Sequence, residues 1–145
     1  MHRLAKRTIM HKQIFVNLAV SDLPRSMAFF KQLGLDFDPR FTDQNAACLV
    51  LGENLYAMLL TRDYFKTFVN KPLCDPKQST EVLVCLSCES RVEVDDLVSR
   101  AVAAGGSVPR DPQDYGFMYG HAFEDPDGHI WELMYMDPNA EILKQ

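Results

Sequence analysis

Hydrophobic residues recur near the start of this chain in a pattern that predicts a strand, a helix and three further strands. The segment at 13–20 (QIFVNLAV) is rich in β-branched and aromatic side chains and predicts a strand. Asp22 is placed to cap a helix whose apolar positions recur at helical spacing, and Gly34 is expected to end it. Three short strands are expected at 36–42, 46–51 and 55–61, with a hairpin turn at 52–54.

The same order of elements returns after a linker. The segment at 81–88 predicts a strand, and Ser90 with Glu93 forms the capping-box pattern of a second helix that Gly105 ends. Further strands are expected at 107–109, 118–124 and 129–136, with a tight turn at 125–128. The prediction is one α+β domain over 13–137, made of two βαβββ modules at 13–61 and 81–137 and a linker at 62–80.

The linker carries three aromatic residues close together, Tyr64, Phe65 and Phe68. Two interpretations stay open: a short helix that packs back on the core, or a segment that folds over the mouth of a pocket. Residues 1–12 and 138–145 are expected to be tails, and we assign no function to either.

Composition and charge exclude several classes of protein. The chain has 145 residues, of which 47% are hydrophobic and 24% charged, as in an ordinary globular domain. A net charge of -5 argues against a nucleic-acid partner, which needs clustered Lys and Arg. No apolar run approaches the roughly 20 residues that cross a bilayer, and the first residues lack the apolar stretch of a secretory signal. We therefore expect a cytoplasmic protein without membrane contact.

The four cysteines are expected to be free thiols, because a reducing cytosol disfavours disulfides. Cys85 and Cys88 have CxxC spacing, but residues three apart on a strand point to opposite faces. They are therefore not expected to share a metal ion or a disulfide.

Glu132 is the residue most able to carry chemistry. It lies in the last strand, where apolar side chains alternate in a way that predicts two largely buried faces. A carboxylate there must bind a metal, accept hydrogen bonds, pair with a cation, or stay protonated. The sequence alone leaves these alternatives open.

Two segments resemble the vicinal oxygen chelate superfamily, which includes glyoxalase I, fosfomycin-resistance enzymes, extradiol dioxygenases and bleomycin-binding proteins. They are FVNLAVSDLPRSMAFFKQLGLDF and EDPDGHIWEL, and the DPDG-x-x-x-E ending is the most specific part. The resemblance covers about residues 13 to 137. It implies that the two modules form a cupped mixed sheet with the helices on the outer face. It also implies a homodimer, because a second subunit often completes the cup.

Metal-using members of that superfamily place metal ligands at four positions. The resemblance puts the last on Glu132 and the others at Phe15, Leu59 and Leu83, which are apolar here. A catalytic metal usually needs about three protein ligands. We therefore predict no cofactor and no metal-ligating residue, although a divalent metal is not ruled out.

The cup inferred from this alignment is mostly apolar, with Asn17 and Glu132 as polar anchors. The predicted substrate-binding residues are Phe15, Asn17, Leu59, Leu83, Met118 and Met134. Such a lining suits a small, largely apolar molecule. Cys85 is interpreted as a core residue, and His121 as lying one residue off the inward register.

Two main functions compete at this point. One is a glyoxalase-like lyase or isomerase in which Glu132 is the catalytic base. The other is a non-catalytic protein that sequesters a drug or metabolite. A metal-dependent dioxygenase is the least supported, because it would need histidines at Phe15 and Leu83.

Overall fold

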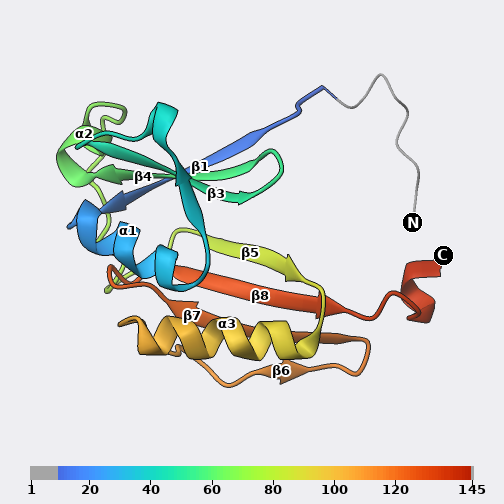
Figure 1. Cartoon of the computed structure of the whole chain (residues 1–145). Coiled ribbons are helices and arrows are strands. Elements are labelled where there is room, and N and C mark those ends of the chain that lie inside the picture. Colours follow the sequence, from blue (N-terminus) through green and yellow to red (C-terminus); the bar gives the residue numbers. More distant parts are fainter. Residues whose placement is uncertain (1–9, 145) are drawn as a thin grey trace.

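The fold was obtained as a computed structural model that describes residues 10–144. The predicted tail at 1–9, with the expectation about a secretory signal, and Gln145 lie outside the described residues. The first module (Figure 1) consists of β1 (Ile14–Val20), α1 (Leu23–Gln32), β2 (Asp36–Asp38), the 3-10 helix η2 (Pro39–Phe41), β3 (Ala46–Gly52) and β4 (Leu55–Thr61). After α2 (Arg62–Lys66), the second module consists of β5 (Leu83–Cys88), α3 (Arg91–Ala103), β6 (Gln113–Asp114), β7 (Met118–Glu124) and β8 (Ile130–Met136), followed by η3 (Glu141–Lys144).

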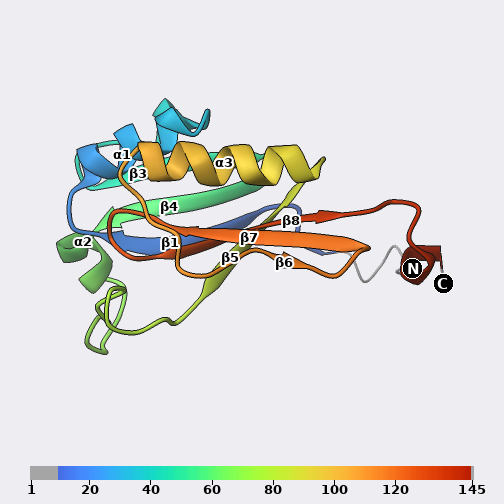
Figure 2. The ribbon, with the colours of Figure 1, turned by 90° about the horizontal axis from the view of Figure 1, so that it is seen from below.

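The two modules share one topology. The first sheet has the strand order β1-β4-β3-β2 and the second β5-β8-β7-β6, with β1–β4 and β5–β8 as the parallel pairs. Figure 2 shows α1 and α3 on the same side of the strands, so that the other face of each sheet is left open. This confirms the α+β prediction with two βαβββ modules.

Local capping explains where the two long helices begin. The Asp22 carboxylate accepts a hydrogen bond from the Arg25 backbone N–H at 3.0 Å, and the Ser90 hydroxyl accepts one from the Glu93 N–H at 3.0 Å. Beyond α3, Gly106 passes against β7, where an added Cβ would lie 2.5 Å from the Glu124 carbonyl oxygen. Only glycine fits that approach without movement of the backbone.

The core lies between the helices and the covered faces of both sheets. Phe30 of α1 packs edge-on against Trp131 of β8, with ring centroids 5.1 Å apart, and Phe29 lies 5.8 Å from Phe123 of β7. Because α1 belongs to the first module and these strands to the second, the aromatic cluster joins the modules.

Several predicted boundaries differ from the structure. The strand expected at 36–42 stops at Asp38, because Pro39 begins a 3-10 turn. The Asp38 carboxylate caps this turn by accepting a hydrogen bond from the Arg40 backbone N–H. The strand expected at 107–109 is a single bridge between Ser107 and Glu124, and β6 was not predicted. The linker contains the short helix α2, none of whose residues is buried. In the part of the chain that the structure describes, no helix has the length and apolarity needed to cross a membrane.

Candidate functional site

Strand register decides which residues of the first module face the open side. Phe15 and Asn17 of β1 pair with Tyr56 and Met58 of β4, and the Phe15 and Tyr56 rings stack with centroids 4.8 Å apart. Leu59 instead pairs with Leu18, and its side chain is fully buried in the core. The prediction that Leu59 lines the cup is therefore wrong, because a shift of one residue along a strand reverses the face.

The second module places the other predicted residues on its open face. Cys85 pairs with Glu132, and Leu83 pairs with Ile130. Met118 pairs with Met136, and Met134 lies on the same face because it is two residues from both Glu132 and Met136. Leu83 is 50% exposed, whereas Trp131 on the covered face is 1% exposed. The last strand itself is fully buried at Trp131 and Leu133 on its covered face, and it is partly buried on the face that carries Glu132, which no helix covers.

Glu132 is paired with a cation, one of the four alternatives that the sequence left open. Nη2 of Arg110 donates a hydrogen bond to Oε2 of Glu132 at 2.9 Å, and the two side chains are 32% and 26% exposed. Arg110 comes from the segment before β6, and its side chain reaches Glu132 of β8. Partial exposure limits such a pair to about 0–1 kcal/mol.

Cys85 is exposed beside this ion pair, so the interpretation of Cys85 as a core residue is wrong. Partial burial raises the pKa of the Cys85 thiol, and the negative charge of Glu132 raises it further. The thiolate is therefore disfavoured. Cys88, on the covered face, packs against the core, as the alternation predicted.

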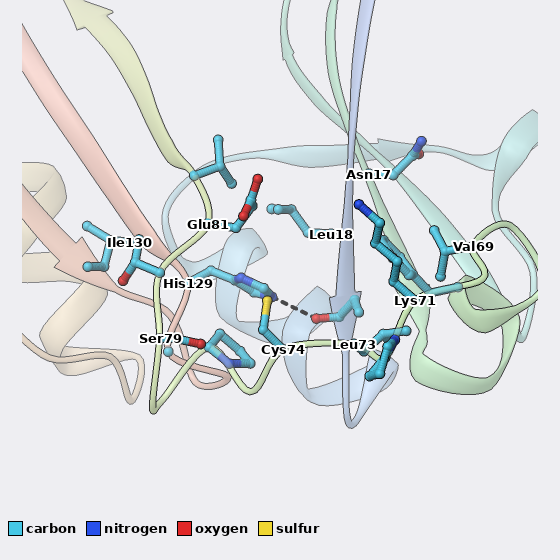
Figure 3. A pocket seen from close by; sticks show the side chains of 17 residues that line it. Asn17, Leu18, Val69, Lys71, Leu73, Cys74, Ser79, Glu81, His129 and Ile130 are labelled. Carbon is cyan, nitrogen blue, oxygen red and sulfur yellow. Dashed lines mark hydrogen bonds between the residues drawn. The ribbon is translucent and has the colours of Figure 1, made fainter.

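Two cavities adjoin Asn17. The linker cavity, of about 360 Å³, lies between the end of β1, the chain at 65–82 and the start of β8 (Figure 3). The η2 cavity, of about 400 Å³, lies over the open face of the first sheet and is bounded by η2 and α2. Asn17 lines both, so it lies between the two cavities.

The aromatic residues of the linker form walls of these cavities. Phe65 lines the linker cavity, and Tyr64 and Phe68, whose rings lie edge to face at 5.1 Å, line the η2 cavity. The linker thus contains a short helix, as one interpretation predicted, but α2 has no buried residue, and its aromatic side chains line the cavities instead of the core.

Most predicted site residues lie outside the two cavities. Asn17 lines both, whereas Phe15, Leu83, Met118, Glu132 and Met134 are on the open faces and line neither. Sequence reasoning missed Lys71 and Glu81, which line the linker cavity. They lie in irregular chain, where no periodicity indicates which side chains converge.

The DPDG turn is structural. Asp125 accepts hydrogen bonds from three backbone N–H groups of the turn and from Nε1 of Trp131, and burial raises the pKa of its carboxyl group. Asp127 accepts from the backbone N–H and hydroxyl of Ser21 at 2.9 and 2.7 Å. Ring Nε2 of His129 lies 2.7 Å from the Ala19 carbonyl oxygen, so the turn holds the second module against the end of β1.

His121 lies on the covered face of β7, opposite Leu133, as its predicted register required. Its Nδ1 is buried and has no hydrogen-bond partner among the described residues. It faces away from Glu132 and does not contribute to the open side.

The side chains at the four inferred ligand positions do not suit a divalent metal. Asn17 of β1 pairs with Met58 of β4 in the first module, as Cys85 of β5 pairs with Glu132 of β8 in the second. The β4 residue that corresponds to Glu132 is therefore Met58. Phe15, Met58 and Leu83 offer no side-chain oxygen or nitrogen. Among residues 10–144, no three His, Cys, Asp or Glu side chains gather closely enough to hold a metal ion.

Comparison with known proteins identifies the family. A family model, the Glyoxalase/Bleomycin resistance protein/Dioxygenase superfamily, matches residues 12–133. The chain belongs to this superfamily. No curated protein matches the sequence.

Several solved structures share the fold. Hypothetical protein SA1046 from S. aureus is 28% identical, with a TM-score of 0.74, and the match covers 87% of this chain and 94% of that one. A glyoxalase-related enzyme from Fulvimarina pelagi is 22% identical, with a TM-score of 0.71 and coverage of 86% and 88%. The fosfomycin resistance protein FosX from Listeria monocytogenes is 18% identical, with a TM-score of 0.63 and coverage of 94% and 100%.

Proposed function

We propose that this superfamily member binds a small, largely apolar molecule at Asn17, between the linker cavity and the η2 cavity, and holds it without a metal. The observation that carries the proposal is the position of Asn17, a polar side chain between two concave sites. An amide offers both a donor and an acceptor, which fixes the orientation of a ligand whose body lies against apolar walls.

The cavities are large enough for this role. Ligand sites for small molecules typically measure about 300–1,000 Å³ and combine apolar walls with a few polar groups. The linker cavity, at about 360 Å³, has Phe65, Val69 and Leu73 among its walls. Sequestration needs only this shape and the Asn17 contact, so it agrees with the apolar residues at the usual ligand positions.

A second candidate is proton transfer by Glu132, favoured by its place on an open face beside Cys85. Two features count against it. Arg110 occupies Oε2, one of the two oxygens that would take a proton, and Glu132 lines neither cavity. A substrate held at Asn17 would therefore lack a base within the same cavity.

Binding of the neutral fluorophore dansylamide tests the proposal. We expect a saturable fluorescence increase that Asn17→Leu weakens and that Ala19→Trp, which fills the linker cavity, abolishes. Asn139→Leu, at an exposed position that lines neither cavity, is the control. Dansylamide affinity that neither cavity variant changes would refute the site.

Metal loading separates sequestration from catalysis. After incubation with Zn(II), Ni(II), Mn(II) or Fe(II) and dialysis, we expect substoichiometric metal and no turnover of methylglyoxal hemithioacetal. Stoichiometric metal together with turnover would overturn the proposal, and turnover that Glu132→Gln abolishes would establish the second candidate instead.

We further propose that the chain works as a homodimer in the cytosol. Its four cysteines are all free, which suits a reducing compartment. The open faces expose large apolar side chains, Phe15 at 48% and Leu83 at 50%, which a second copy would cover. Light scattering during size-exclusion chromatography should give twice the chain mass, and a monomer at micromolar concentration would contradict the dimer.

A further inference from the structure

Two charged side chains of opposite sign line the linker cavity. Lys71 and Glu81 both belong to its wall and both are exposed. In Figure 3 the two lie on either side of β1, with the Lys71 ammonium group on the same side as Asn17 and Glu81 on the other side. An elongated ligand that crosses β1 would therefore meet a cation at one end and an anion at the other.

Three neighbouring charged side chains of the linker, Lys66, Asp75 and Arg62, already have partners within the chain. Lys66 lies 4.0 Å from Asp63, Asp75 accepts a hydrogen bond from the Lys77 backbone N–H, and Arg62 donates to the Cys74 carbonyl oxygen. The ion pairs found among residues 10–144 include neither Lys71 nor Glu81. These two charges at the cavity wall are thus left for a ligand.

Opposite charges on an apolar cavity select for the matching charges on a ligand. Apolar walls supply affinity but little orientation, whereas charged groups fix the register of a ligand and reject like charges. Lys71 and Asn17 together suit a carboxylate or another anionic oxygen group. Glu81 suits a protonated amine.

From this arrangement we infer the ligand class: an amphoteric small molecule, with an apolar body, an anionic group held by Lys71 and Asn17, and an ammonium group held by Glu81. The inference rests on the proposed binding function and deepens it. It also explains why the two charged anchors lie on the linker, because the open-face positions of the sheet near Asn17 carry the uncharged residues Phe15, Ala19 and Met58.

Three dansyl probes of different charge test the inference. Dansylamide is neutral, dansyl-6-aminohexanoate carries a carboxylate, and dansylcadaverine carries an ammonium group. We expect Lys71→Gln to weaken the carboxylate probe by about two- to fivefold and to leave the other two unchanged. Glu81→Gln should weaken dansylcadaverine by a similar factor and spare the others.

Matched variants control for general changes of surface charge. Lys66→Gln removes a nearby cation that lines neither cavity, and Glu53→Gln removes an exposed anion in the β3–β4 turn. Neither is expected to change the affinity for any probe. Fluorescence of Trp131, the only tryptophan, reports whether each variant is folded.

The outcomes for the two proposals are distinguishable. If dansylamide itself fails to bind, the proposed function is wrong, and this inference with it. If dansylamide binds and Ala19→Trp abolishes it, but Lys71→Gln and Glu81→Gln do not discriminate between the charged probes, the cavity stands and the amphoteric ligand class is refuted.

Discussion

Removing the Asp127 carboxylate should separate the two modules at the point where they form the linker cavity. Asp127 is 7% exposed and lies in the turn before β8, whereas its partners Ser21 and Ser26 lie at the end of β1 and in α1. Gly128 and the end of β1 both line the linker cavity. The change Asp127→Ala therefore tests the contact that holds the cavity walls together.

The size of the effect follows from the individual contacts. Oδ1 of Asp127 accepts two short hydrogen bonds from Ser21, at 2.9 and 2.7 Å, and hydrogen bonds to a charged group contribute about 1.5–3 kcal/mol each. The contacts with Ser26 at 3.3 Å and with Arg25 at 3.5 Å are long and add little. Ser21 is exposed, so water replaces part of the loss. We expect Asp127→Ala to cost about 3 kcal/mol, or roughly 6–12 °C in Tm.

Urea unfolding followed by Trp131 fluorescence measures this loss. Trp131 is 1% exposed in the core and becomes solvated on unfolding. Asp127→Asn keeps an oxygen for Ser21 and should cost only about 1 kcal/mol. The control Asp111→Ala changes an exposed carboxylate and should stay within about 0.5 kcal/mol of the parent. A loss below about 1 kcal/mol for Asp127→Ala, or equal losses at positions 127 and 111, would refute the role of Asp127.

Further predictions concern a glycine and the thiols. Gly106→Ala should lower the free energy of unfolding by about 2 kcal/mol, because the added Cβ would lie 2.5 Å from the Glu124 carbonyl oxygen. The control Gly120→Ala, whose Cβ would have no atom nearer than 3.7 Å, should be tolerated in the same urea assay. Burial raises the pKa of Cys88 to about 11, so at pH 8 only about one thiol in a thousand is ionised there. Timed alkylation with iodoacetamide and peptide mass spectrometry should show exposed Cys74 reacting first, and Cys88 accelerating as pH rises toward 11; equal rates at pH 8 would contradict the burial of Cys88.

The order of elements was predictable because each signal was local. Strand alternation, the caps at Asp22 and Ser90 and the glycines after the helices act within a few residues, and all four long strands of the hairpins were placed within a residue or two. The two-residue strand β6 carries no periodicity, and it forms through pairing with β7 at Tyr119 and Gly120. Such pairing depends on tertiary context, which a single sequence does not display.

The site was less predictable because it depends on register and on irregular chain. Counting along the family pattern missed the β4 position by one residue, so that Leu59 was chosen where Met58 faces the open side. The pairing of Glu132 with Arg110 spans 22 residues and has no motif. Lys71 and Glu81 reach the cavity through the path of the linker, which obeys no period.

A difference between the repeated halves explains why the η2 cavity has no counterpart over the second sheet among the cavities described above. After β4 the chain turns into α2, and Tyr64 of α2 lines the η2 cavity over the first sheet. After β8 the chain also forms a short helix, η3, but Figure 1 shows it leading away from the strands, and none of its residues is buried. The open face that carries Glu132 therefore lacks the cover that its counterpart has. Because Ile142 of η3 is itself 56% exposed, both the uncovered sheet and η3 present apolar surface that the proposed homodimer would bury.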